Sequence, residues 1–296
     1  MNGSSDNTAV GAYSLAAITE GSNTVAIGYG AGGGLTTGNS NTIVGQGACD
    51  TGTLAADGNV VVGQAAAANL AGGALNTIIG AEAGNDLVSG ANNVLVGSYA
   101  GDALGAGESF NISIGQHSMG SWDEGSGGTV DHNIAIGYQA FLGGNMGTSS
   151  ETAVGNIAIG SYALDATSAD DKTGSVAIGY EALTANTSGE GNTAVGYQAG
   201  AAIVSGIENT IVGYQAHDVG LGDGNVAIGK AAMGSMSHAT SDKNTAVGSY
   251  ALLSTGANAV LGATAIGNSA LLELTCAGGS GQYNTAVVYS ASANIT

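Results

Sequence analysis

The chain of 296 residues contains no proline and no arginine, and its basic side chains are Lys172, Lys230 and Lys243. The formal net charge is −19, and such a surface repels phosphate backbones and anionic lipid headgroups. Nucleic acid is therefore not expected as a partner. Membrane insertion is not expected either, because the chain has no run of 18 apolar residues. Without proline or a Gly-X-Y period, collagen is also excluded.

Aromatic residues make up 5% of the chain and charged residues 8%, while glycine accounts for 54 positions. High glycine in a low-complexity sequence usually indicates disorder. Here, however, 44% of the residues are hydrophobic, and a chain with so much apolar surface and so little charge should bury part of it. The composition therefore favours a folded protein of unusual architecture.

Cysteine occurs twice, at Cys49 and Cys276. The repeats described below separate the two by about twelve coils, and at ~4.8 Å per coil they would lie roughly 60 Å apart. A disulfide needs Cα atoms within ~7 Å. Both cysteines are therefore expected to be free or packed, with pairing to another chain as the alternative.

An eight-residue repeat, Asn-Thr-Ala-Val-Gly-Tyr-Gln-Ala, runs through the whole chain and is unaltered at residues 192–199. A sixteenth copy, residues 284–291, carries Val288 in place of the repeat glycine. Wider gaps indicate insertions near residues 116–132 and 141–151. The glycines of the other copies are Gly11, Gly28, Gly45, Gly63, Gly80, Gly97, Gly115, Gly137, Gly160, Gly179, Gly196, Gly213, Gly229, Gly248 and Gly267.

The residues before each glycine have the pattern of a short strand. Val or Ile precedes the glycine, and Thr, Val or Ile stands two residues earlier, as in Val25 and Ile27. These two positions share one face, and the residue between them, mostly Ala, points to the other. The strand is thus apolar on both faces, which is typical of burial on both sides. We expect Ile159 and Val195 to point into a packed coil.

Three further features complete the predicted coil. The glycine allows a turn with positive φ, and a small residue three positions later suits a second short strand. The Asn that opens most repeats suits a turn and could form a ladder between coils. Apolar residues lack helical spacing and the glycines would break helices. We predict one all-β domain over residues 1–296, a parallel β-solenoid of about sixteen coils.

The segments Asn-Thr-Val-Ala-Ile-Gly at 23–28, Gly-Ser-Val-Ala-Ile-Gly at 174–179 and Gly-Asn-Val-Ala-Ile-Gly at 224–229 resemble head repeats of trimeric autotransporter adhesins, the YadA-like heads. The repeat at 192–199 is also similar to repeats in tail fibres of bacteriophages, especially marine ones. The resemblance covers essentially the whole chain, although these coils are longer and less uniform than those of adhesin heads. It implies a left-handed β-roll with two strands per coil, three chains in one trunk, and an extracellular or virion-surface location.

The strand pattern also predicts a homotrimer, because the second apolar face of each strand needs a partner and symmetric self-association would provide it. Terminal coils expose apolar layers, so we expect trimers to stack end to end or to dock on other virion or adhesin domains. The predicted function is a structural fibre or head segment of a virus particle, such as a phage tail fibre, that contributes to attachment at a host cell surface. The alternatives are the head of a bacterial surface adhesin, or a secreted solenoid that binds ice or forms filaments.

His117 and His132 bracket the first insertion, which also contains Trp122, Asp123 and Glu124. These residues could form a recognition patch or a metal site, and the plainer interpretation is a surface loop anchored by the tryptophan. No His or Cys spacing indicates a metal. No catalytic residue and no cofactor is predicted, and the protein is not expected to be an enzyme.

Two weaker patterns remain open. Acidic loops at residues 57–59 and 222–225 could bind Ca²⁺ through oxygen ligands, although they lack the spacing of an EF-hand. The Thr column of the strands could order water, as on an ice-binding surface. Because Val and Ile replace Thr irregularly in that column, an interface is the preferred interpretation.

Overall fold

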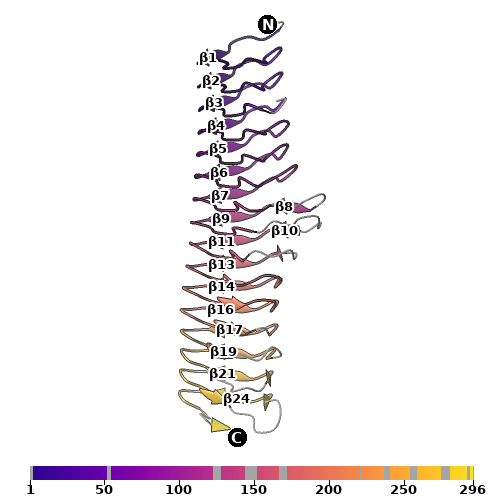
Figure 1. Cartoon of the computed structure of the whole chain (residues 1–296). Helices are drawn as coiled ribbons and strands as arrows, with labels where there is room; N and C mark the ends of the chain where they lie inside the picture. The colour runs from indigo at the N-terminus through magenta and orange to yellow at the C-terminus, as the bar shows by residue number, and fades with distance from the viewer. Residues whose placement is uncertain are drawn as a thin grey trace. The chain divides into compact units, whose positions relative to one another are not determined.

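The computed structural model describes residues 3–51, 55–122, 128–143, 152–166, 172–220, 222–236, 241–253, 259–274, 281–291 and 294–295. The chain divides into two compact units, residues 1–155 and 156–296. Within the described ranges there is no helix, and each unit is an all-β parallel β-solenoid (Figure 1). The predicted fold class is confirmed.

In unit 1, the described residues form a main sheet of eight parallel three-residue strands that follow one another in chain order. Each of the three residues in a strand pairs with its equivalent in the next repeat, as Ala9 pairs with Ala26. The insertions add β8 (Thr129–Asp131) and β10 (Thr152–Val154), which pair with each other. The main strands are β1 (Thr8–Val10), β2 (Val25–Ile27), β3 (Thr42–Val44), β4 (Val60–Val62), β5 (Thr77–Ile79), β6 (Val94–Val96), β7 (Ile112–Ile114) and β9 (Ile134–Ile136).

Unit 2 repeats the arrangement, with eight main strands among its described residues. Each of the predicted repeats thus supplies one strand. The main strands are β11 (Ile157–Ile159), β13 (Val176–Ile178), β14 (Thr193–Val195), β16 (Thr210–Val212), β18 (Val226–Ile228), β19 (Thr245–Val247), β21 (Thr264–Ile266) and β24 (Thr285–Val287). The minor strands are β12 (Lys172–Thr173), β15 (Ala202–Ile203), β17 (Val219–Gly220), β20 (Val260–Leu261), β22 (Glu273–Leu274), β23 (Gly281–Gln282) and β25 (Asn294–Ile295).

The middle residue of each main strand, and not the residues on either side of it, points into the coil. Ala158 and Ala194 are fully buried, whereas Ile159 and Val195 are only half-buried. The expectation that Ile159 and Val195 point inward is therefore wrong. Alternation lets a three-residue strand send either one or two side chains inward, and the narrow coil accepts only the middle one.

The inward side chains of neighbouring coils fit together by size. Gly84 lies four residues after the repeat glycine of its coil. Because it has no side chain, it leaves space that the large middle residues of nearby strands fill. A Cβ added at Gly84 would lie 2.9 Å from Leu95 Cδ1 and 3.4 Å from Ile78 Cδ1. Where the same position holds Leu164 or Leu183, the strand residue is alanine instead. In these coils a large residue at one of the two positions accompanies a small residue at the other, which keeps the layer closely packed.

The repeat glycines have the positive φ that the sequence predicts, and they also permit close stacking. Gly80 has φ +145°, and a Cβ there would lie 2.2 Å from the carbonyl oxygen of Gly97 in the next coil. The residues that follow form turns and not the second strand that was expected. In the coil of β2, Ala31 N donates to Gly28 O (3.3 Å), and Gly32 N donates to Ala48 O of the next coil (2.8 Å).

A ladder of buried asparagines links the coils, as the repeat predicts. Asn76 Nδ2 donates to Gly90 O (2.9 Å), and Asn76 Oδ1 accepts from Asn93 N (2.9 Å) and Asn93 Nδ2 (3.1 Å). The ladder asparagine itself is not left-handed. That conformation belongs to the residue before it, such as Leu75 with φ 59°. The amides therefore satisfy buried backbone groups that would otherwise lack partners.

Candidate interaction surface

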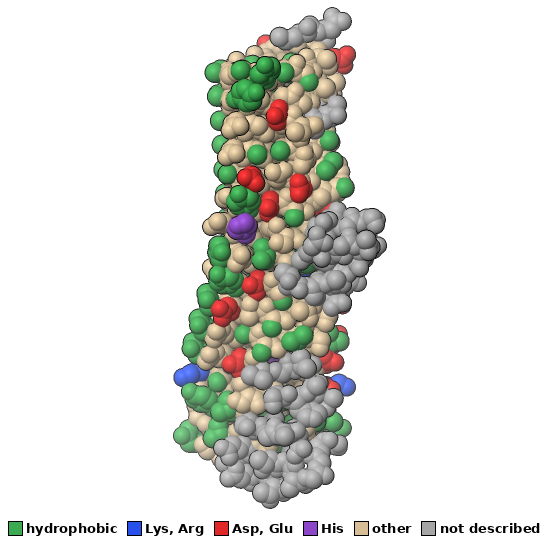
Figure 2. Space-filling view, viewed as in Figure 1, with side chains coloured by type: hydrophobic (Ala, Val, Ile, Leu, Met, Phe, Trp, Pro, Cys, Tyr) green, Lys and Arg blue, Asp and Glu red, His purple; other side chains and the backbone are tan. Residues whose placement is uncertain are grey.

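The outer face of the main sheet is aliphatic and uncovered in the single chain. In unit 1 the strand residues that flank the buried middle position include Val10, Ile27 and Ile79, which are 54%, 41% and 39% exposed. In unit 2 the same column contains Ile228 and Ile266. None of the flanking positions in the main strands is charged. Figure 2 shows apolar side chains along the left edge of each unit, with acidic side chains nearby.

The Thr-bearing column lies on this same outer face. Thr42 and Thr77 alternate in it with Val25, Val60 and Val94. Parallel pairing keeps these side chains in line from coil to coil, as Thr42 pairs with Val60 and Thr77 with Val94. The face thus combines one wholly aliphatic column with one mixed column.

A stack of tyrosines stands beside this face in unit 2. The Tyr180 and Tyr197 rings are stacked with centroids 5.4 Å apart, and Tyr197 and Tyr214 follow at 5.2 Å. The next residues form an amide ladder, since Gln215 Nε2 donates to Gln198 Oε1 at 2.8 Å. These side chains are partly exposed, so the stack supports the coils and also adds aromatic surface.

The structure separates the residues of the predicted recognition patch. His117 follows β7 and stacks on Tyr99 at 4.8 Å, whereas His132 precedes β9 and stacks on Phe110 at 4.8 Å. The two histidines thus lie at opposite ends of the strands, each paired with an aromatic ring of the preceding coil. Their stacking gives them a structural role that the sequence did not reveal.

Trp122 is fully buried and cannot present a contact surface in this conformation. Its Nε1 donates to Phe141 O at 2.7 Å, and the two rings lie 4.6 Å apart. Trp122 therefore anchors the insertion, as the plainer interpretation held. Asp123 and Glu124 lie outside the described residues.

The acidic loops considered for calcium are engaged in hydrogen bonds between coils. Asp57 Oδ1 accepts from Asn39 N at 2.6 Å, and Asp223 Oδ1 accepts from Ile207 N at 3.0 Å. Within the part of the chain that the structure describes, no group of three or more His, Cys, Asp or Glu side chains could hold a metal ion.

Two of the buried titratable groups have a pKa shifted by burial in the coil interior. Cys49 is a buried free thiol, and burial raises its pKa to about 12; Cys276 lies outside the described residues. His217 is also buried, and burial lowers its pKa to about 4. Other coils have Leu183, Met233 or Leu252 at the position of His217. The histidine is thus a polar replacement in an apolar column.

The low pKa of His217 makes stability depend on pH. The folded chain favours the neutral ring. The full contribution of His217 to the free energy of unfolding is therefore present above pH 6.5, and it is lost as the pH falls toward 4. We expect this residue to reduce the free energy of unfolding by about 2 kcal/mol between pH 7 and pH 5. Urea unfolding of the protein and of His217→Leu at both pH values measures the difference.

The leucine variant controls for carboxyl groups that act in the opposite direction. Burial raises the pKa of Asp102 to about 6 and also raises the pKa of Asp218. Protonation of either carboxyl group on acidification raises the free energy of unfolding, and both groups remain in the variant. Equal loss of stability in the two proteins between pH 7 and pH 5 would show that His217 does not titrate in this way.

Comparison with protein-family models, curated proteins and solved structures finds no match to this chain. None of the described residues belongs to a helix long and apolar enough to cross a membrane. A function for this chain is therefore inferred from the geometry of the outer sheet face.

Proposed function

We propose that the chain is a structural segment of a fibre or head on a virus particle, assembled as a homotrimer, and that it contributes to attachment at a host cell surface. The observation that carries this proposal is the uncovered aliphatic face of the parallel sheet. Parallel sheets almost always have both faces covered. Extended apolar patches on soluble proteins usually mark interaction sites.

Another copy of this chain is the occupant that fits the face best. The columns repeat at the spacing of stacked strands, ~4.8 Å, and a surface with the same repeat can match them along their length. The face also lacks charge, so like-charge repulsion between copies of this acidic chain is kept away from the contact. Closed rotational symmetry would cover the face on every copy.

Docking at the end of the stack is favoured over continued stacking. In the coil of β24, Val288 takes the place of the repeat glycine with φ 125°. A Cβ at Gly267, the preceding glycine, would already lie 2.7 Å from the Val288 carbonyl. A repeat coil placed in register beyond β24 would therefore meet the valine side chain. We propose that a different domain of the particle or adhesin binds there.

Attachment can be tested with fluorescently labelled protein and candidate host cells. We expect saturable binding that falls when residues 123–127 are deleted with Trp122 retained, since Trp122 is part of the core. Circular dichroism should show the parent fold in the deletion variant. Unchanged binding by the folded variant would remove this insertion from the attachment surface. Immunogold labelling of virus particles would support the viral segment over a bacterial adhesin. Neighbouring genes give a second test, since tail genes indicate the viral segment and an anchor-bearing gene indicates the adhesin.

Ice binding is a second candidate, and the outward position of the Thr-bearing column favours it. Thr42 and Thr77 lie on a regular exposed face and not inside the coil. Thermal hysteresis by a monomeric protein, abolished in Thr77→Asp, would support this function over the fibre. A trimer without thermal hysteresis would exclude it.

A further inference from the structure

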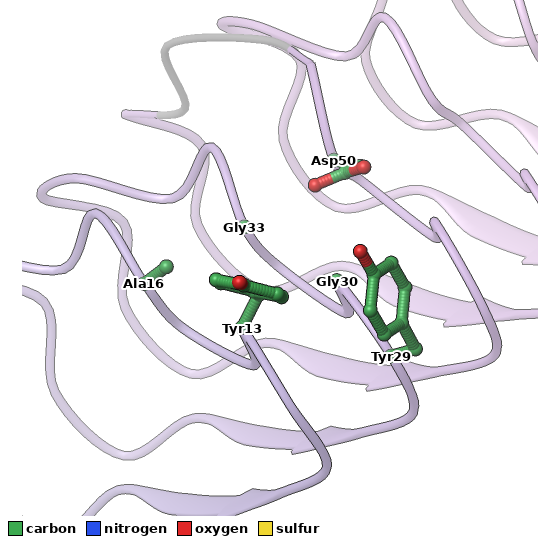
Figure 3. Close-up of a pocket in the computed structure, with 6 residues that line it drawn as sticks. All are labelled: Tyr13, Ala16, Tyr29, Gly30, Gly33 and Asp50. Atoms are coloured by element: carbon green, nitrogen blue, oxygen red, sulfur yellow. The ribbon is translucent and has the colours of Figure 1, made fainter.

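A hollow in unit 1 is lined by two exposed tyrosines and one carboxylate. Its volume is about 330 Å³, and the residues that line it are Tyr13, Ala16, Tyr29, Gly30, Gly33 and Asp50. Figure 3 shows the Tyr13 and Tyr29 rings on successive coils, with Asp50 on the coil after Tyr29. The volume is within the range of small-molecule sites.

Two glycines create the space. A Cβ at Gly33 would lie 2.3 Å from Asp50 Oδ1, and one at Gly30 would lie 3.2 Å from both carboxylate oxygens. The equivalent positions of other coils hold larger residues, such as Glu82 and Asn85. In the coil of β2, a carboxylate of the next coil can therefore lean against the backbone beside the tyrosines.

The tyrosine rings form a corner. They are 80° apart with centroids separated by 5.5 Å, and the side chains are 68% and 57% exposed. In the stack of Tyr180, Tyr197 and Tyr214, by contrast, the rings cover one another's faces. Aromatic faces carry a partial negative charge that attracts cations. The corner thus offers ring surface together with the full charge of Asp50.

The charge around the hollow selects a cation. Unit 1 contains no lysine or arginine, and the whole chain has a formal net charge of −19. An anionic ligand would be repelled, and no basic side chain of unit 1 other than histidine competes for the carboxylate. We propose that this hollow binds an alkylated ammonium group, with the Tyr13 and Tyr29 rings contacting its methyl groups and Asp50 neutralising its charge.

Choline and its neutral isostere 3,3-dimethylbutan-1-ol test the proposal, with fluorine NMR of the full-length protein carrying 3-fluorotyrosine. Tyr13→Phe and Tyr29→Phe identify the two signals. We expect choline to shift both signals with a dissociation constant in the millimolar range, and the isostere to shift neither. Equal shifts with the neutral isostere, or none with choline, would overturn the proposal.

Substitutions give the second test. Asp50→Asn should weaken choline binding at least about fivefold, because the charge is lost and the shape is kept. Tyr29→Ala should abolish binding, whereas Tyr197→Ala, a change of an exposed tyrosine in the unit 2 stack, should leave it unchanged. Undiminished binding by Asp50→Asn, or an equal loss in Tyr197→Ala, would contradict the assignment.

The source of the ammonium group can be separated in the same system. Co-sedimentation with phosphatidylcholine vesicles, lost in Tyr29→Ala, would identify a lipid headgroup. Binding of free choline without vesicle binding would identify a small molecule or a methylated amine on another protein. Both results require the Tyr13, Tyr29 and Asp50 site. A neutral saccharide is the negative control, and we expect it to compete neither with free choline nor with the vesicles.

Discussion

Gly80→Ala is expected to unfold the coil stack in which it lies, with a loss of more than about 4 kcal/mol in the free energy of unfolding. The added Cβ would lie 2.2 Å from Gly97 O and 2.5 Å from Gly97 C, and φ is +145°. The added Cβ would therefore clash with the backbone of the next coil, and the backbone conformation at Gly80 would itself be strained for a residue with a side chain. The contact is with backbone, so no flexible side chain can move aside.

Two other glycines provide graded controls for this substitution. Gly47 has φ +64° and nothing within 4 Å of an added Cβ, and Gly107 also has open space there. Gly47→Ala should cost about 1 kcal/mol through its left-handed backbone alone, and Gly107→Ala should cost almost nothing. Urea unfolding followed by circular dichroism measures all three. If Gly80→Ala were no worse than Gly107→Ala, close stacking through the glycine column would be disproved.

Ala194→Asp and Val195→Asp are expected to fail in different ways although the residues are adjacent. Ala194 is fully buried inside the coil, so an aspartate there places an unpaired charge in the core and should cost more than about 4 kcal/mol. Val195 lies half-buried on the outer face of β14. An aspartate there should leave the coil folded and dissociate the proposed trimer, because each copy brings a like charge to the same contact.

Circular dichroism and sedimentation velocity distinguish the two outcomes. Ala194→Asp should lose β structure, whereas Val195→Asp should keep it and sediment as a single chain. If Val195→Asp remained associated like the parent, the face that contains β14 would not be the interface. Loss of β structure in both variants would show that the outer face also belongs to the core of the coil.

The sequence predicted those parts of the fold that depend on one residue type at a fixed place. The glycine column, the strands before it and the asparagine ladder all require a specific backbone conformation or hydrogen bond, as Gly80 and Asn76 show. Period-two alternation, however, states only which residues share a face. It could not show that Ala194 and not Val195 points inward.

Residue size gives a signal for that choice in several coils, although not in the coil of Ala194, where the position four after the glycine holds Gly200. Large strand residues such as Ile78 and Leu95 occur beside Gly84, and small ones such as Ala177 occur beside Leu183. Such compensation between the middle strand position and the position four after the glycine is expected only inside a packed layer. The hollow at Tyr13 and Tyr29 could not be predicted in this way, because it depends on a carboxylate from the next coil.

The burial of Trp122 shows the same limit for the insertion. A lone tryptophan beside charged residues is compatible with recognition or with anchoring, and the choice depends on whether its Nε1 finds a buried partner. Phe141 O provides that partner at 2.7 Å. The residue that decides the role of Trp122 is therefore Phe141, which is distant in the sequence, and the residues next to Trp122 do not reveal it.

Sedimentation equilibrium of the purified protein at micromolar concentration tests the central claim most directly. The chain has a mass of 28.2 kDa, and covering of the aliphatic sheet face by two further copies predicts a species of three times that mass, with no concentration-dependent dissociation in this range. A stable monomer of 28.2 kDa would contradict the account, because the outer faces of both units would then be exposed to water in the functional protein.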